Sequence, residues 1–134
     1  MANIRDIEGI GDAYAAKLEG IGINTLADLL KEGATRAGRE SIAEKSGLSE
    51  KQILEWVNRA DLDRVKGVGS EFADLLEASG VDSVAELAQR VPANLAAKMA
   101  EVNAAKNLVN RVPSESEVAG WVENAKTLDK VVTH

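Results

Sequence analysis

The stretch Ile7–Leu30 reads IEGIGDAYAAKLEGIGINTLADLL, and 58 positions later Val65–Ala88 reads VKGVGSEFADLLEASGVDSVAELA. The two stretches align without a gap, and the glycines of the first turn, Gly9 and Gly11, recur in the second. Most other positions are identical or exchange one side chain for another of the same kind. Self-similarity at a fixed spacing is typical of a repeated structural unit. The sequence therefore predicts a duplicated helical unit built around an apolar-Gly-apolar-Gly turn.

Composition and length favour the all-α class. The 134 residues suit one domain, alanine and leucine are abundant, and there are two prolines and no cysteine. The absence of cysteine excludes a disulfide framework and thiol chemistry. No segment resembles a signal peptide or approaches the roughly 20 apolar residues of a membrane span. We therefore expect a cytoplasmic protein that does not bind to a membrane.

Capping residues, glycines and apolar spacing predict eight or nine helices. They cover residues 11–19, 25–33, 35–46, 49–63, 70–78, 83–90, 92–102 and 103–110, and a last helix begins at residue 114. Trp121 is the counterpart of Trp56, but their spacing is 65 residues, compared with 58 for the turn units. The second half has therefore gained seven residues, which we place in the short helix after Asn103. We expect an all-α single domain over residues 1–134. Repeat 1 (about 7–64) and repeat 2 (about 65–128) would be related by pseudo-twofold symmetry.

The four aromatic residues follow the duplication, because Tyr14 pairs with Phe72 and Trp56 pairs with Trp121. Apolar residues at equivalent positions of two copies are typical of a core. The functional alternative, a platform on which nucleic-acid bases stack, requires exposed aromatic rings. Since no aromatic residue is left over, we interpret all four as core residues.

Both turns match the helix-hairpin-helix motif, which reads apolar-x-apolar-Gly-apolar-Gly and continues into a helix with Ala and Leu. The matching residues are Ile7, Gly9, Ile10, Gly11, Ala15 and Leu18 in the first copy, and Val65, Gly67, Val68, Gly69, Ala73 and Leu76 in the second. The chain thus resembles DNA repair and recombination proteins whose tandem motifs grip both backbones of a duplex across its minor groove. This resemblance implies phosphate contacts from the amides of the four glycines, because a helix N-terminus suits an anion.

The charges near the turns depart from that family. Residues 1–30 carry two basic and five acidic side chains, and residues 65–88 carry one and five. DNA-binding members usually have basic or small polar residues after the second glycine, whereas here Asp12 follows Gly11, and Ser70 and then Glu71 follow Gly69. An acid at a helix N-terminus occupies the groups that a phosphate would use. We therefore favour a tight helix–helix connector, capped by Asp12, over a phosphate site.

Two kinds of partner remain open for the turns, a protein and, less favoured because of the acidic surroundings, nucleic acid. Few cations are available for phosphates, whose neutralisation supplies most non-specific affinity for DNA. The candidate partner-binding or phosphate-binding residues are Gly9, Ile10, Gly11, Asp12, Lys17, Lys66, Gly67, Val68, Gly69 and Ser70.

Other stretches carry weaker resemblances. GINTLADLL and GVDSVAELA are similar to the second half of helix-hairpin-helix units such as the C-terminal domain of RNA polymerase alpha. Taken whole, the layout resembles an uncharacterised bacterial family of duplicated helix-hairpin-helix units, a domain of unknown function that implies no activity. SIAEKSGLSEKQILEWV has the spacing of a helix-turn-helix, and its second helix would present residues such as Glu50 and Asn58 to a groove. Two acids and no arginine suit base edges poorly, so we favour a packing role.

Nothing in the sequence is typical of a catalytic site. The one histidine is His134, and the paired acids Asp61/Asp63 and Glu115/Glu117 resemble solvated helix ends. We expect no enzyme activity, no cofactor and no metal site. The function we predict is a non-catalytic helical adaptor or scaffold that binds a protein partner. The alternative is weak, sequence-independent binding of duplex DNA through the two Gly-x-Gly hairpins.

The ends of the chain suggest how the two halves close. A full predicted helix, 49–63, precedes the second turn, but only residues 1–6 precede the first. The segment Val122–Val132 resembles Val57–Gly67 with one residue inserted. We expect the C-terminal helix to pack against the first unit and to bury Trp121 between the halves. Closure within one chain would give a monomer, and the same contact with a neighbour would give a dimer mediated by the C-terminal helix.

Overall fold

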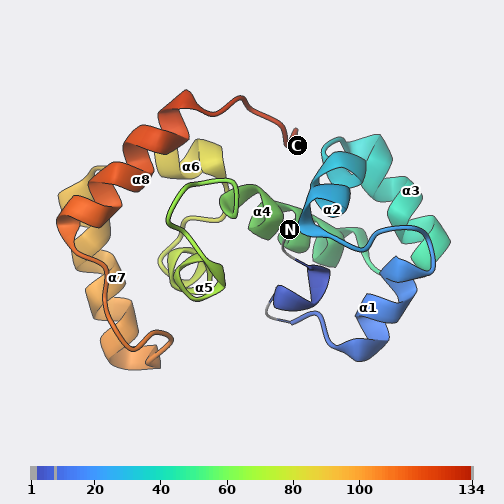
Figure 1. The fold of residues 1–134 in the computed structure, drawn as a ribbon, viewed down its shortest axis with the longest axis horizontal. Coiled ribbons are helices and arrows are strands. Elements are labelled where there is room, and N and C mark those ends of the chain that lie inside the picture. Colours follow the sequence, from blue (N-terminus) through green and yellow to red (C-terminus); the bar gives the residue numbers. More distant parts are fainter. Residues whose placement is uncertain (1–2, 8, 134) are drawn as a thin grey trace. The chain divides into compact units, whose positions relative to one another are not determined.

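The computed structural model describes residues 3–7 and 9–133, and its named elements are all helices (Figure 1). They are a 3-10 helix η1 (Ile4–Asp6) and the α-helices α1 (Asp12–Glu19), α2 (Leu26–Gly33), α3 (Arg36–Ser46), α4 (Glu50–Leu62), α5 (Ser70–Ala78), α6 (Val84–Ala88), α7 (Pro92–Lys106) and α8 (Glu115–Thr127). The all-α fold expected from the composition is confirmed.

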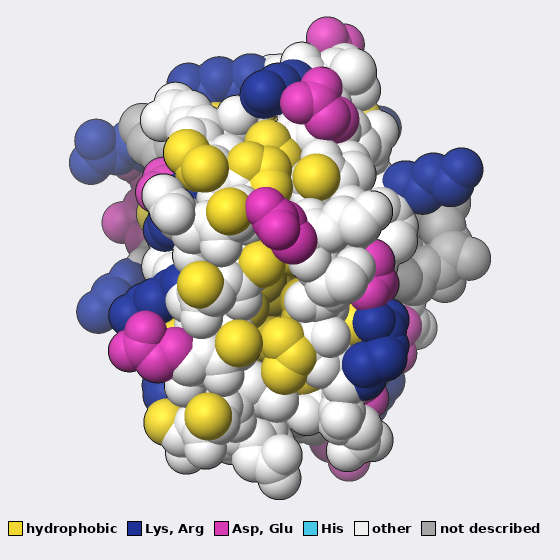
Figure 2. Space-filling model, turned by 90° about the vertical axis from the view of Figure 1, so that its left-hand side faces the viewer, with side chains coloured by type: hydrophobic (Ala, Val, Ile, Leu, Met, Phe, Trp, Pro, Cys, Tyr) yellow, Lys and Arg dark blue, Asp and Glu magenta, His cyan; other side chains and the backbone are white. Residues whose placement is uncertain are grey.

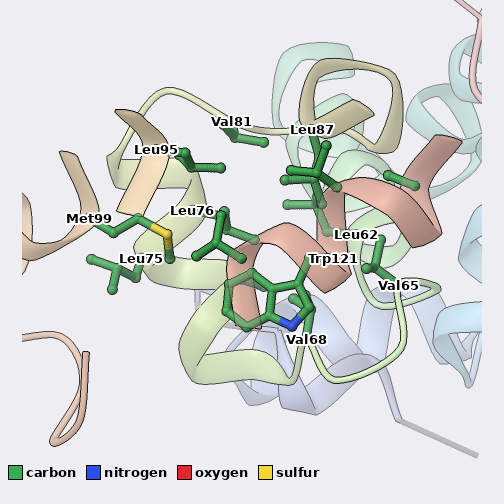
Figure 3. Close-up of a cluster of buried hydrophobic side chains, with 14 of the residues drawn as sticks. Leu62, Val65, Val68, Leu75, Leu76, Val81, Leu87, Leu95, Met99 and Trp121 are labelled. Carbon is green, nitrogen blue, oxygen red and sulfur yellow. The ribbon is translucent and has the colours of Figure 1, made fainter. Parts of the chain in front are cut away.

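The chain forms two compact units. Unit 1 comprises Met1–Asp61 together with Lys130–His134, and unit 2 comprises Leu62–Asp129. Each unit has its own hydrophobic core. The unit 1 core includes Ile4, Leu18, Leu29, Ile53, Trp56 and Val132. The unit 2 core includes Leu62, Leu76, Leu87, Leu95, Met99 and Trp121 (Figure 3).

Hydroxyl caps set the helix starts, as the capping pattern predicts. The side chains of Thr25, Thr35, Ser83 and Ser114 each accept a hydrogen bond from the backbone N–H three residues later. Pro92 occupies the first turn of α7, where its missing N–H costs nothing.

The predicted short helix 103–110 is wrong. Helix α7 instead continues to Lys106 and ends at Asn107, whose φ of 50° is left-handed. The Asn103 side chain then holds the loop that follows, because its Oδ1 accepts from the Val109 N–H at 2.9 Å and its Nδ2 donates to the Val109 carbonyl at 3.1 Å. Asparagine tolerates the left-handed conformation, which lets α7 end at Asn107 and lead directly into this loop.

A tryptophan packs in the core of each unit. Trp56 and Trp121 are both 4% exposed. The Tyr14 ring lies 5.5 Å from that of Trp56, and the Phe72 ring lies 5.2 Å from that of Trp121, both tilted. The core interpretation is therefore right for the tryptophans and wrong for Tyr14, which is 36% exposed although it packs against Trp56.

The prediction that Trp121 is buried between the two halves is wrong. Helix α8 ends at Thr127 and packs against α6 and α7 of its own unit, so Trp121 lies in the core of unit 2. The extended tail that follows α8 belongs to unit 1. Val132 is 3% exposed in the unit 1 core, and the Thr133 N–H donates to the Ala34 carbonyl at 2.8 Å.

Candidate functional sites

The two Gly-x-Gly turns have the same local geometry. Gly9 has a φ of +95° and Gly67 a φ of +91°, which is backbone that favours glycine. The Ile10 N–H donates to the Ile7 carbonyl and the Val68 N–H to the Val65 carbonyl, both at 3.1 Å. These apolar residues are buried, whereas the glycines of both turns are exposed.

The second glycine of each turn begins a helix without a side-chain cap. Gly11 and Gly69 are extended and make no capping hydrogen bond, and a Cβ added to either would meet no atom within 4 Å. Ser70, another predicted site residue, is the first residue of α5. The first turns of α1 and α5 therefore differ from those of α2, α3, α6 and α8, which carry hydroxyl caps.

The prediction that Asp12 caps α1 is wrong. Its Oδ1 accepts a hydrogen bond from Arg5 Nη1 at 2.6 Å, and Arg5 Nη2 donates to Glu19 Oε1 at 3.0 Å. Arg5 lies outside the repeated stretch and seven residues before Asp12, so the motif held no signal for this pairing. Both carboxylates raise the pKa of Arg5, Glu19 more strongly. The pair leaves the α1 amides without a side-chain cap.

A second arginine, which lies outside the Gly-x-Gly motif residues, contacts the helix that follows the other turn. The Arg111 guanidinium lies 5.6 Å from the Phe72 ring centroid and also pairs with Glu117. The Lys66 amide donates to Asn124 Oδ1 at 2.9 Å, so α8 holds this turn in place. The predicted site cations Lys17 and Lys66 are exposed. The motif at each turn gave no indication of Arg5 or Arg111, because neither arginine is one of its residues.

A cavity of about 390 Å³ lies beside the second turn. Its lining residues are Lys66, Gly67, Ser116, Glu117, Gly120, Trp121 and Asn124. Gly120 is exposed in the middle of α8, where a glycine costs helix stability, and its Cβ position is open. The site thus brings Lys66 and Gly67 together with α8 residues that the repeat pattern does not single out.

We expect Glu117 to make the stability of unit 2 depend on pH in the acid range. Hydrogen bonds from Arg111 and from the Ser114 backbone lower its pKa to about 2. Because the folded-state pKa lies below the unfolded value, this group stabilises the fold above about pH 4.5, and the contribution is lost as the pH falls toward 2. We expect Glu117→Gln to flatten the decline in stability over that window, measured by urea unfolding at several pH values. Glu101→Gln, an exposed acid on α7, is the control and should leave the decline unchanged.

An apolar surface on α7 and α8 was not predicted. Figure 2 shows hydrophobic side chains gathered in a band over this face. Val91 is 56% exposed, and a shallow cavity of about 490 Å³ joins it to α8. Its lining residues are Val91, Pro92, Ala93, Glu115, Ser116 and Ala119. Exposed alanines continue along α7 at Ala97, Ala100 and Ala104. The signal lay in the spacing of Ala93, Ala97, Ala100 and Ala104, which is four, three and four residues and places them on one side of a helix.

The helix-turn-helix interpretation finds no support in burial. Asn58, one of the residues assigned to a groove-facing surface, is 6% exposed on α4. This agrees with the packing role that we favoured. Glu8, inside the first hairpin, and the one histidine, His134, lie outside the described residues.

A comparison with protein-family models matches residues 8–128 to a domain of unknown function, DUF4332. The chain belongs to this family. No curated protein and no solved structure matches it. Within the described residues, no helix is long and apolar enough to cross a membrane, and no group of three or more potential metal ligands is present.

Proposed function

We propose that this DUF4332 protein is a non-catalytic adaptor whose α7–α8 face docks an amphipathic helix of a protein partner. The observation that carries the proposal is the 56% exposure of Val91, which lines an apolar cavity with Pro92, Ala93 and Ala119. Apolar surface left in water is costly, and contiguous patches of it commonly mark interaction sites.

The chemistry of the face suits a helix as the occupant. Alanines at Ala97, Ala100 and Ala104 offer little steric bulk, so a second helix can approach closely. Exposed charged residues also lie on α7, Lys98 next in sequence to Ala97 and Glu101 next to Ala100. They supply polar groups at the rim, as is usual for interfaces that form and dissociate.

A photo-crosslinking amino acid at Ala100 tests this proposal in cells. We expect one dominant adduct that is absent when the crosslinker replaces Glu44, an exposed residue of α3. With the partner purified, Ala97→Glu should weaken binding by about tenfold or more, because it buries a charge in the apolar contact. Identical adducts from both positions, or unchanged affinity of Ala97→Glu, would contradict the proposal.

Duplex DNA binding through the hairpins is the second candidate. Its support is the lack of side-chain caps at Gly11 and Gly69, which leaves two helix N-termini on exposed turns. The acidic side chains around them oppose it. Arg5 is already engaged by Asp12 and Glu19 and so offers little charge to a phosphate.

We expect negligible affinity for a short duplex near physiological salt, measured by fluorescence anisotropy, because few phosphates would be neutralised. Replacing Asp12 and Glu71 with lysine should raise the affinity and make it steeply dependent on salt. Micromolar binding by the unmodified chain, weakening steeply with salt, would instead favour DNA as the partner.

A further inference from the structure

A cavity of about 330 Å³ lies in unit 1 between the first turns of α3 and α4. Its lining residues are Arg36, Arg39, Glu50, Lys51 and Leu54. Three cationic side chains therefore face one carboxylate, in a chain whose net charge is −6. Neither the apolar face of unit 2 nor the hairpins include any of these residues.

The cations lie at the helix ends that disfavour them. Arg36 is the first residue of α3, which has no acid in its first turn, and Lys51 is the second residue of α4. The amino end of a helix carries a partial positive charge, so cations there are repelled. Local conflicts of this kind are found at functional or strained sites.

Arg39 adds a buried charge to the same cavity. It is 5% exposed and donates to three carbonyls, those of Gly33 at 2.8 Å, Ala34 at 3.1 Å and Thr133 at 2.6 Å. Among the described residues, no carboxylate forms an ion pair with it. Burial, and then repulsion from Arg36, lowers its pKa, while Glu50 raises it. A buried guanidinium bonded to neutral carbonyls keeps a positive field at the cavity wall.

Arg36 and Lys51 remain available to a ligand. Arg36 Nε lies 3.4 Å from Glu40 Oε1, but this pair is 79% and 55% exposed, and such surface pairs contribute little. Lys51 lines the same cavity from α4 and is exposed. Arg36 and Lys51 can therefore contact a bound anion, while Arg39 supplies a buried positive charge at the wall of the same cavity.

We propose that this cavity of unit 1 binds a dianionic phosphate monoester, held by Arg36 and Lys51 over the buried charge of Arg39. Guanidinium groups match phosphate oxygens in charge and geometry, and a lysine adds a point charge. One compact cavity suits a terminal phosphate group better than a duplex, whose binding requires several neutralised phosphates. The apolar part of Leu54 would contact the group that bears the phosphate.

Titration calorimetry with inorganic phosphate, at constant ionic strength, tests the site. We expect binding by the full chain, a rise in its melting temperature, and at least about a tenfold loss of affinity in the double variant Arg36→Gln, Lys51→Gln. The matched control is Lys31→Gln, Lys45→Gln, which removes two exposed charges from the same unit and should bind normally. No binding, or an equal loss in both variants, would overturn the proposal.

Two further probes identify the source of the phosphate. A phosphoserine peptide that binds more tightly than inorganic phosphate, with the same dependence on Arg36 and Lys51, would assign the site to a phosphorylated protein. Equal or weaker binding of the peptide would assign it to a small phosphorylated molecule. A short DNA duplex that binds through these two residues more tightly than either monoester would overturn the assignment.

Discussion

Removal of residues 114–134 is expected to unfold unit 2. Helix α8 contributes four core residues, each no more than 4% exposed: Val118, Trp121, Val122 and Ala125. They pack against α6 and α7, which would otherwise present apolar surface to water. Loss of one buried tryptophan alone typically costs about 3–5 kcal/mol, a large fraction of a domain's stability. Loss of helical circular dichroism and binding of a hydrophobic dye would report the unfolding.

A shorter truncation separates the helix from the tail. Removing residues 130–134 takes Val132 from the unit 1 core, together with the hydrogen bonds of Thr133 to Ala34 and Arg39. We expect a loss of about 2–4 kcal/mol in unit 1, while unit 2 stays folded. Amide signals in an NMR spectrum would distinguish the two units. A chain ending at residue 113 that remained soluble and fully folded would contradict the role given to α8.

The difference between helix and tail shows what local sequence encodes. Caps and apolar spacing predict most helices because they act within a few residues, as at Thr25 and Ser114. For the last helix the sequence predicted a start at residue 114 but no end, although the β-branched run Val131–Thr133 follows it. Such residues lose side-chain freedom in a helix, and the helix ends at Thr127. Which unit the tail contacts depends on tertiary packing.

The candidate sites also divide into features that local sequence predicts and features that depend on tertiary packing. The glycine turns could be found from the sequence because their backbone conformation requires particular residues. Arg5 and Arg111 could not, since they lie outside the motif residues that mark the two turns. The cluster of Arg36, Arg39 and Lys51 joins the starts of two helices, and only their packing brings these cations to one cavity. A sum of charges over a segment of the sequence does not reveal such a cluster, because acidic residues in the same segment cancel its charge.

Replacement of Gly67 by valine is expected to cost about 3 kcal/mol or more. At a φ of +91° a β-branched residue is strained, and a Cβ would approach Trp121 Nε1 to 3.1 Å. Trp121 is packed in the core and cannot move without opening it, so overpacking adds to the strain. Urea unfolding monitored by tryptophan fluorescence measures the change in the free energy of unfolding.

Gly69→Val is the matched comparison, because it makes the same substitution two residues later in the same turn. The repeat pattern suggests that both glycines are required for their backbone angles, but Gly69 is extended and its Cβ position is open. Its replacement should cost no more than about 1 kcal/mol, the difference between a good and a poor helix N-cap. Equal losses at the two positions would show that the left-handed angle of Gly67 is not what constrains the hairpin. A large loss at Gly67 alone would assign the constraint to that angle and to its contact with Trp121.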